Sequence, residues 1–188
     1  MKDLVALASE LQSFMEMRKW RYCFIGGLAV QHWGEPRLTR DLDLTVLTGF
    51  GGEAAYVDAL LSLYSPRIED ARGFALQNRV LLLKSEEGIG LDIALGALPF
   101  EEKCVSRAQN IEMLPNVHIK LCSAEDLIVL KAFASRERDW ADIRGILIRQ
   151  GTERLDWKYI LDEVTVLAKL KEEPEIIARL TGLRQSDL

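Results

Sequence analysis

A pair of aspartates that alternates with apolar residues is the feature that most constrains how this chain can fold. The segment, residues 40–46, reads Arg-Asp-Leu-Asp-Leu-Thr-Val. Side chains alternate between the two faces of a strand, so Asp41 and Asp43 project from one face while Leu42 and Leu44 take the other. Two parallel carboxylates repel each other unless a cation lies between them, and hard divalent cations prefer carboxylate oxygens. We therefore expect a half-buried strand that carries a candidate metal site.

Two consecutive glycines precede this strand. Gly26 and Gly27 follow an apolar segment, 21–25, and come before a segment with helical character, 28–33. Backbone N–H groups at the start of a helix can face a phosphate, and glycine lets the backbone approach closely. Glycines after a strand also often make only a tight turn. Combined with the carboxylates, the first interpretation suggests chemistry on a nucleoside triphosphate.

The length and composition are those of an ordinary globular protein. The 188 residues fit one domain, or one domain with a small subdomain. Hydrophobic residues make up 48% and charged residues 28%, and no apolar run approaches the length of a membrane span. The N-terminal segment carries Asp3 and Glu10 and reads as an amphipathic helix rather than a secretory signal. We expect a cytoplasmic protein with no membrane partner.

The net charge of −5 argues against broad, non-specific binding to nucleic acid, which needs a basic surface. A local basic patch and scattered solvated charge are equally good interpretations of the basic residues near the candidate site, namely Arg37, Arg40, Arg72, Arg79 and Lys84.

Three cysteines far apart and two histidines give no structural zinc spacing, so buried free thiols are the better interpretation.

Hydrophobic periodicity predicts strands in the first two-thirds of the chain and mostly helices in the last third. The predicted strands are 21–25, 42–47, 79–84 and 91–95, followed by a hairpin within 111–121. The predicted helices are 3–18, 28–33, 53–64, 99–109, a helix that begins after Ser123, and 138–149, 156–170 and 174–182. This order predicts a mixed α/β (α+β) fold with a catalytic lobe over 1–122 and a helical subdomain over 123–188.

These motifs together resemble the signature of the nucleotidyltransferase superfamily that includes DNA polymerase β. Residues 25–27 supply its apolar-Gly-Gly element, and residues 41–44 supply Asp-apolar-Asp-apolar. The spacing Arg37-x-Thr39-x-Asp41-x-Asp43 is similar to that of the AbiEii-type nucleotidyltransferase toxins and their small relatives. The resemblance implies a short, twisted, mixed sheet flanked by helices.

The same resemblance implies a third acidic residue on a later strand and a lysine on a downstream helix. Asp92 lies alone among apolar residues in 90–95, and Lys131 lies in the helix that follows Ser123. An Asp in such a strand either faces solvent or faces the site, because a buried, unpaired carboxylate would be costly. Lys131 shares a helix face with apolar residues and is either a cation against the triphosphate or a lysine that snorkels at the helix margin.

The resemblance also assigns roles to these residues. Asp41 and Asp43 would hold a Mg²⁺ or Mn²⁺ ion bound to the triphosphate, and Asp92 would complete a second metal site with them. The residues expected to contact the nucleotide are Gly26, Gly27, Arg37, Thr39 and Arg40. Arg37 and Arg40 are alternatively salt-bridge partners in a loop, and Thr39 alternatively fixes that loop. Arg138, Asp139 and Asp142 resemble the charged stretch that follows this helix in the family, and a salt bridge to a neighbouring helix is their favoured role.

The function implied is metal-dependent transfer of a nucleoside monophosphate from a triphosphate, ATP or CTP, to an acceptor hydroxyl. The acceptor would be RNA such as tRNA, a protein side chain or a small molecule, and the chain would work in a toxin–antitoxin system with a cognate antitoxin or another partner protein. Two alternatives stay open. One is a catalytically silent nucleotide-binding or antitoxin-like module of the same fold, and the other is an aminoglycoside-type small-molecule nucleotidyltransferase.

Overall fold

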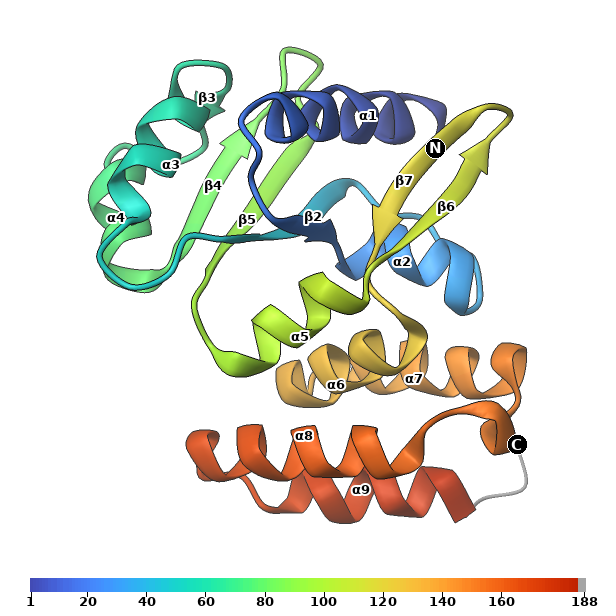
Figure 1. Ribbon diagram of the computed structural model, residues 1–188. Coiled ribbons are helices and arrows are strands. Elements are labelled where there is room, and N and C mark those ends of the chain that lie inside the picture. Colours follow the sequence, from blue (N-terminus) through green and yellow to red (C-terminus); the bar gives the residue numbers. More distant parts are fainter. Residues whose placement is uncertain (186–188) are drawn as a thin grey trace. The chain divides into compact units, whose positions relative to one another are not determined.

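The computed structural model describes residues 1–185, which fall into two compact units (Figure 1). The first unit comprises residues 1–28 and 38–122. The second comprises residues 29–37 together with the chain from Ser123 onward. Helix α2 (Gly26–Trp33) therefore begins in the first unit and ends in the second. No helix within residues 1–185 combines the length and the apolar character needed to cross a membrane.

The first unit is built on a mixed sheet, in which the strand order is β3-β4-β5-β2-β1-β7-β6. The pairs β2–β5 and β1–β7 are parallel, and the other neighbouring strands are antiparallel. This arrangement confirms the predicted mixed α/β class. The strands are β1 (Tyr22–Phe24), β2 (Asp41–Leu47), β3 (Ser65–Pro66), β4 (Val80–Lys84), β5 (Gly90–Gly96), β6 (Gln109–Leu114) and β7 (Val117–Leu121).

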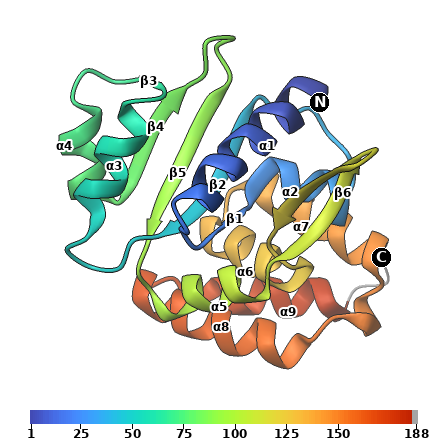
Figure 2. The same ribbon diagram turned by 45° about the horizontal axis from the view of Figure 1, so that its top comes forward.

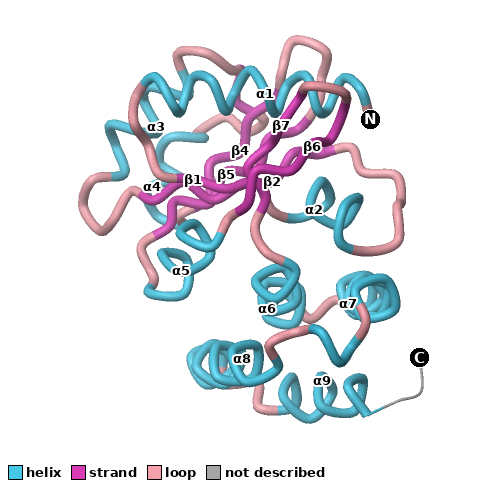
Figure 3. Tube along the Cα trace, turned by 45° about the vertical axis from the view of Figure 1, so that its right-hand side comes forward, coloured by secondary structure: helices cyan, strands magenta, loops and turns pink. Residues whose placement is uncertain are grey.

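Helices cover both faces of this sheet (Figures 1 and 3). Helix α1 (Lys2–Met17) lies on one face and α5 (Pro99–Arg107) on the other, while α3 (Glu53–Leu61) and α4 (Ala71–Asn78) lie beside β4, at the end of the sheet where β3 is the edge strand (Figure 2). The main core forms on the face covered by α1, because alternate residues of the central strands are apolar there. Its fully buried members include Leu11, Leu42, Leu44, Leu81, Leu83, Leu91 and Ile93.

The second unit contains α6 (Ala124–Ala134), α7 (Glu137–Gln150), α8 (Trp157–Lys171) and α9 (Glu175–Gln185), with a short 3₁₀ turn, η1 (Thr152–Arg154). Helix α6 packs against α7 and α8, and α8 packs against α9. The Ser123 hydroxyl caps α6 by accepting from the Asp126 N–H at 3.1 Å. Tyr159 of α8 donates to the Asp126 carboxylate at 2.5 Å, so the cap also joins two helices.

Residues 29–37 belong to the second unit because they contact α7. Arg149 donates to the carbonyl oxygen of Gly34 at 3.0 Å, and Gln150 donates to that of Trp33 at 2.7 Å. A Cβ atom on Gly145 would lie 3.1 Å from the backbone nitrogen of Glu35, so a small residue at position 145 permits this approach.

Each strand and helix predicted from periodicity is present in residues 1–185, with shifts of a few residues at the ends. The predicted helix 53–64 is shorter and ends at Leu61, and the predicted helix 99–109 ends at Arg107 because Gln109 already pairs in β6. Three elements were missed, namely β3, α4 and η1. Helix α4 buries only Ala71 and Ala75 and contains a glycine, so its apolar periodicity is weak. Strand β3 has only two residues, which leaves no alternation to detect.

Candidate functional site

The parallel pairing of β2 and β5 brings three carboxylates onto one face of the sheet. The register places Asp43 beside Asp92 and Asp41 beside Gly90. Residues paired across neighbouring strands point to the same face, so Asp41, Asp43 and Asp92 share a face. The side chains of Asp41 and Asp92 are 52% and 37% exposed. The residues between them on the same strands, such as Leu42 and Leu91, are fully buried on the opposite face.

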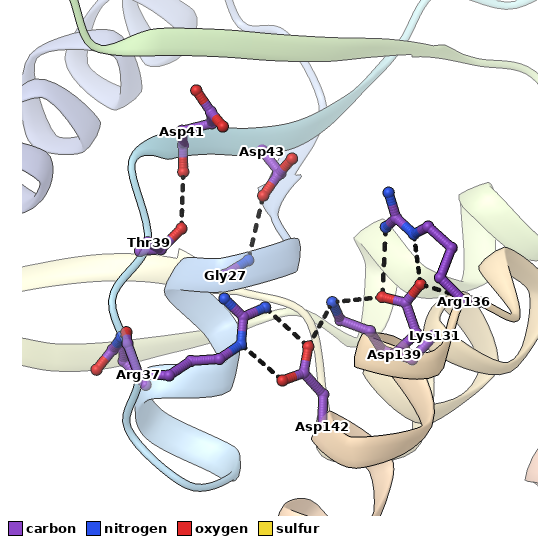
Figure 4. Close-up of polar contacts among 10 residues, drawn as sticks. Gly27, Arg37, Thr39, Asp41, Asp43, Lys131, Arg136, Asp139 and Asp142 are labelled. Atoms are coloured by element: carbon purple, nitrogen blue, oxygen red, sulfur yellow. Dashed lines mark hydrogen bonds and ion pairs between the residues drawn. The ribbon is translucent and has the colours of Figure 1, made fainter.

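The two glycines lie where the start of α2 approaches β2. The N–H of Gly27 donates to Oδ2 of Asp43 at 3.1 Å (Figure 4). Gly26 has φ +56°, and a Cβ atom there would lie 2.1 Å from the same carboxylate oxygen and 2.6 Å from Asp43 Cβ. A Cβ atom on Gly27 would lie 2.2 Å from the Thr39 hydroxyl. Both positions therefore require glycine for close approach, and an N–H at this helix start already binds an anionic oxygen.

Thr39 also orders the entry to β2. Its hydroxyl donates to the backbone carbonyl of Asp41 at 3.3 Å (Figure 4). The structure thus supports the loop-fixing interpretation of Thr39. Arg40, the next residue, is exposed. Contact of Thr39, Arg40, Gly26 and Gly27 with a nucleotide stays a prediction.

A cation that sequence reasoning missed lies among the carboxylates. Arg67 follows β3, and its guanidinium forms an ion pair with Asp92 through Nη2. Its Nη1 is 3.8 Å from Oδ1 of Asp41. No motif marks Arg67 in the sequence, because it reaches the carboxylates only through the pairing of β3 with β4 and of β4 with β5.

The carboxylates are suited in type to a hard divalent cation, because each offers oxygen ligands. Within residues 1–185, no three side chains of the His, Cys, Asp and Glu types are grouped closely enough to hold a metal ion. A guanidinium instead lies between Asp41 and Asp92 and shows that this position accepts positive charge. The carboxylates are thus of the type that a divalent metal prefers, but in this arrangement they bind Arg67, and metal binding stays a prediction.

A second charged cluster is contained entirely within the second unit (Figure 4). Nζ of Lys131 lies 2.9 Å from Asp139 Oδ1 and 2.8 Å from Asp142 Oδ2. Arg37 binds Asp142 in a bidentate pair at 2.7 and 2.8 Å, and Arg136 binds Asp139 at 2.6 Å. The predicted salt bridge from Asp139 and Asp142 to a neighbouring helix is confirmed, since Lys131 lies on α6. We call these five residues the buried ion network after its two buried carboxylates, although the Arg136 side chain is itself 76% exposed.

Burial and hydrogen bonding act in opposite directions on the two aspartates of this network. Burial acts to raise the pKa of Asp142, but hydrogen bonds from Arg37 and Lys131 outweigh it and leave the pKa below its usual 3.8. The same holds for the pKa of Asp139, where burial is outweighed by hydrogen bonds from Arg136 and Lys131. Both carboxylates are therefore ionised at neutral pH, and each is compensated by two cations.

The structure gives Lys131 and Arg37 protein partners. The Lys131 side chain is 9% exposed and lies between two carboxylates, whereas that of Arg37 is 25% exposed and binds Asp142. The salt-bridge alternative for Arg37 is thus observed. Contact of either residue with a triphosphate stays a prediction.

Comparison with solved structures places the chain among proteins with the nucleotidyltransferase fold. An antigenic nucleotidyltransferase-like protein from Paracoccidioides brasiliensis matches with a TM-score of 0.56 and 15% identity, over 96% of this chain and 93% of that one. The antibiotic-resistance factor ANT(2″)-Ia matches with a TM-score of 0.57 and 14% identity, over 96% of this chain and 97% of that one. The lincomycin-bound lincosamide antibiotic adenylyltransferase LnuA matches with a TM-score of 0.47 and 17% identity, over 73% and 92%.

The similarities in the first two comparisons confirm the predicted nucleotidyltransferase fold. No protein-family model matches the chain, and no curated protein matches its sequence. The assignment to the AbiEii-type branch therefore stays a prediction.

Substituting Gly26 tests the close approach of α2 to Asp43. We expect Gly26→Ala to lower the free energy of unfolding by about 1–2 kcal/mol because of the positive φ at this position. The loss should be larger still, because the new Cβ atom would clash with Asp43 Cβ, which no side-chain rotation can move away. Gly88→Ala is the matched control, since Gly88 has φ +81° but a Cβ atom there would have no neighbour within 4 Å. Urea unfolding followed by circular dichroism measures both. Equal losses would contradict the steric account.

Removing the lysine tests the buried ion network. We expect Lys131→Met to lower the free energy of unfolding by about 2–3 kcal/mol, because two charge-assisted hydrogen bonds to buried carboxylates are lost, although each carboxylate keeps an arginine. Lys158→Met is the control, since Lys158 is 86% exposed in its pair with Asp162 and its loss should cost less than about 1 kcal/mol. Losses of similar size in urea unfolding would show that the network contributes no more than a surface pair.

The lowered pKa values predict an acid-sensitive contribution to stability. Because Asp139 and Asp142 titrate below their usual 3.8 in the folded chain, their stabilisation is complete above that pH and is lost as the pH falls through the folded pKa values. We expect the difference in melting temperature between wild type and Asp142→Asn to be constant from about pH 8 to 5 and to shrink below about pH 4. A difference that does not change with pH would be inconsistent with an ionised Asp142.

Proposed function

We propose that this chain is a metal-dependent nucleotidyltransferase that moves a nucleoside monophosphate from a nucleoside triphosphate to an acceptor hydroxyl. The observation that carries the proposal is the placement of Asp41, Asp43 and Asp92 on one face of two parallel strands. The start of α2, where the Gly27 N–H meets Asp43, supports it. The fold shared with solved nucleotidyltransferase-like structures agrees with this assignment.

In this proposal Asp41 and Asp43 hold a Mg²⁺ or Mn²⁺ ion, and Asp92 completes a second site with them. When bound, such ions neutralise the triphosphate and align it for in-line displacement. The acceptor oxygen attacks the α-phosphorus, and the bond to the bridging oxygen breaks so that pyrophosphate leaves. The acceptor's proton passes to a carboxylate oxygen of Asp92, which is exposed enough to receive it.

The remaining site residues position the nucleotide. The glycines at 26 and 27 let the backbone at the start of α2 approach the phosphates, and Thr39 fixes the strand entry. We propose that Arg37, Arg40 and Lys131 supply positive charge toward the triphosphate. For Arg37, the pair with Asp142 would fix the direction of the guanidinium.

Two classes of acceptor are candidates for this transfer. RNA such as tRNA, or a protein side chain, with a cognate antitoxin as partner, follows from the resemblance to the AbiEii-type toxins. A small-molecule hydroxyl is favoured by the match to an antibiotic-resistance factor, which spans 96% of this chain and 97% of that one. ATP and CTP are the candidate nucleotides. A silent nucleotide-binding or antitoxin-like module of the same fold is the alternative to any transfer.

The test is transfer of label from each α-labelled nucleoside triphosphate, with Mg²⁺ or Mn²⁺, into cellular RNA, cellular protein and a panel of aminoglycosides. We expect one nucleotide and one acceptor class to be labelled by wild type. Asp43→Asn should lose a factor on the order of 100 or more in rate, because it removes a charge from the reacting centre while keeping an acceptor for the Gly27 N–H.

Asp58→Asn is the matched control, since this exposed aspartate pairs with Arg72 outside the carboxylate cluster. It should transfer label at the wild-type rate. Equal labelling by wild type and Asp43→Asn would contradict the proposal. Nucleotide binding by wild type without labelling of any acceptor would favour the silent module.

A further inference from the structure

Arg67 occupies a defined position among the carboxylates rather than a chance place on the surface. Its backbone N–H donates to the carbonyl of Leu82 at 3.0 Å, which anchors the residue beside β4. Its side chain is only 29% exposed although it follows an edge strand. The guanidinium binds Asp92 through one nitrogen and reaches Asp41 through another. The side chain therefore extends from the β3 edge to two carboxylates on β5 and β2.

Gly90 leaves the room that this arrangement needs. A Cβ atom at position 90 would lie 2.2 Å from Oδ1 of Asp41 and 2.9 Å from Nη1 of Arg67. Gly90 pairs with Asp41 across the strands, so any side chain there would stand between the carboxylate and the guanidinium. The absence of a side chain at this position thus favours the approach of Arg67 to Asp41.

The guanidinium of Arg67 changes the electrostatic balance of the carboxylate cluster. Three carboxylates on adjacent strands repel one another, and a single guanidinium offsets part of that repulsion. The guanidinium binds Oδ1 of Asp92 and lies 3.8 Å from Oδ1 of Asp41, and carboxylate oxygens are also the ligands that a divalent metal prefers. A metal ion and Arg67 therefore compete for the same ligands.

We propose that Arg67 is a built-in counter-cation that a divalent metal must displace from Asp41 and Asp92. The guanidinium keeps the carboxylates in place without metal and lowers the affinity of the free protein for it. This inference deepens the proposed function, because the metal is the one that the nucleotidyl transfer would use. It is tested by metal binding alone, so absence of transfer activity would not count against it.

The primary test is Mn²⁺ binding without nucleotide, followed by the electron paramagnetic resonance signal of the free ion. We expect Arg67→Met to bind Mn²⁺ roughly tenfold more tightly than wild type, because a competing charge has been removed. Arg67→Lys, which keeps the charge but not the forked geometry, should fall between them. Arg72→Met removes the same charge from an exposed pair with Asp58 and should leave the affinity unchanged.

A double variant tests whether Asp41 is the ligand responsible for the tighter Mn²⁺ binding. Arg67→Met combined with Asp41→Asn should lose the gain in affinity, because the vacated ligand is gone. Unchanged or weaker Mn²⁺ binding by Arg67→Met would overturn the proposal, and so would an equal gain in Arg72→Met. If neither wild type nor Arg67→Met bound Mn²⁺ at millimolar concentration, the proposal would also be wrong, because carboxylates freed from the guanidinium should bind the ion.

A measurement on the unaltered chain guards against a variant that does not fold. The Nε–H resonance of Arg67, assigned by its loss in Arg67→Lys, reports whether the guanidinium is held. Adding Mg²⁺ should shift this signal and speed its exchange with water as the ion pairs break. A resonance that stays unchanged at saturating Mg²⁺ would show that metal and guanidinium do not compete.

Discussion

The parallel pairing of β2 with β5 is the constraint on which the rest of the candidate site depends. It aligns Asp43 with Asp92 on one face and places Leu44 beside Ile93 on the other, where both are fully buried. A slip of one residue in either strand would move the carboxylates into the core and the leucines into solvent. The apolar core therefore fixes the register, and the register positions the acidic residues.

Close contacts around the strands then limit which residues the site accepts. Gly26 and Gly27 allow the helix start to meet Asp43 and Thr39, and Gly90 allows Arg67 to meet Asp41. In each case the missing side chain makes room for a polar contact at a carboxylate or beside it. The charged cluster of the second unit has a different character. Its carboxylates are buried and each contacts two cations, so it fixes α6, α7 and residue 37 to one another.

The sequence predicted those features that depend on local spacing. Alternation in a strand is a local property, so the shared face of Asp41 and Asp43 could be inferred from their positions alone. The resemblance added Asp92, whose placement beside Asp43 the structure shows. The strands and longer helices were likewise predicted, because most of them have an apolar stripe of the matching period.

Features that depend on distant pairing could not be predicted in this way. Arg67 reaches Asp92 only because β3, β4 and β5 are neighbours in the sheet, and no spacing in the chain encodes that order. The two carboxylate partners of Lys131 arise from packing of α6 against α7, although the salt bridge of Asp139 and Asp142 to a neighbouring helix was expected. Helix α4 was missed because its burial is slight, and a weakly amphipathic helix leaves little trace in the sequence.

The central claim is that Asp41 and Asp43 hold a metal ion together with a nucleoside triphosphate. The most direct measurement is a crystal structure with Mn²⁺ and a triphosphate analogue that cannot be cleaved at the α–β bridge, with anomalous scattering recorded for manganese. The account predicts an anomalous peak about 2.1 Å from an oxygen of each aspartate and from the phosphate oxygens, with the Arg67 guanidinium withdrawn. A bound triphosphate whose manganese peak lies away from both aspartates would contradict it.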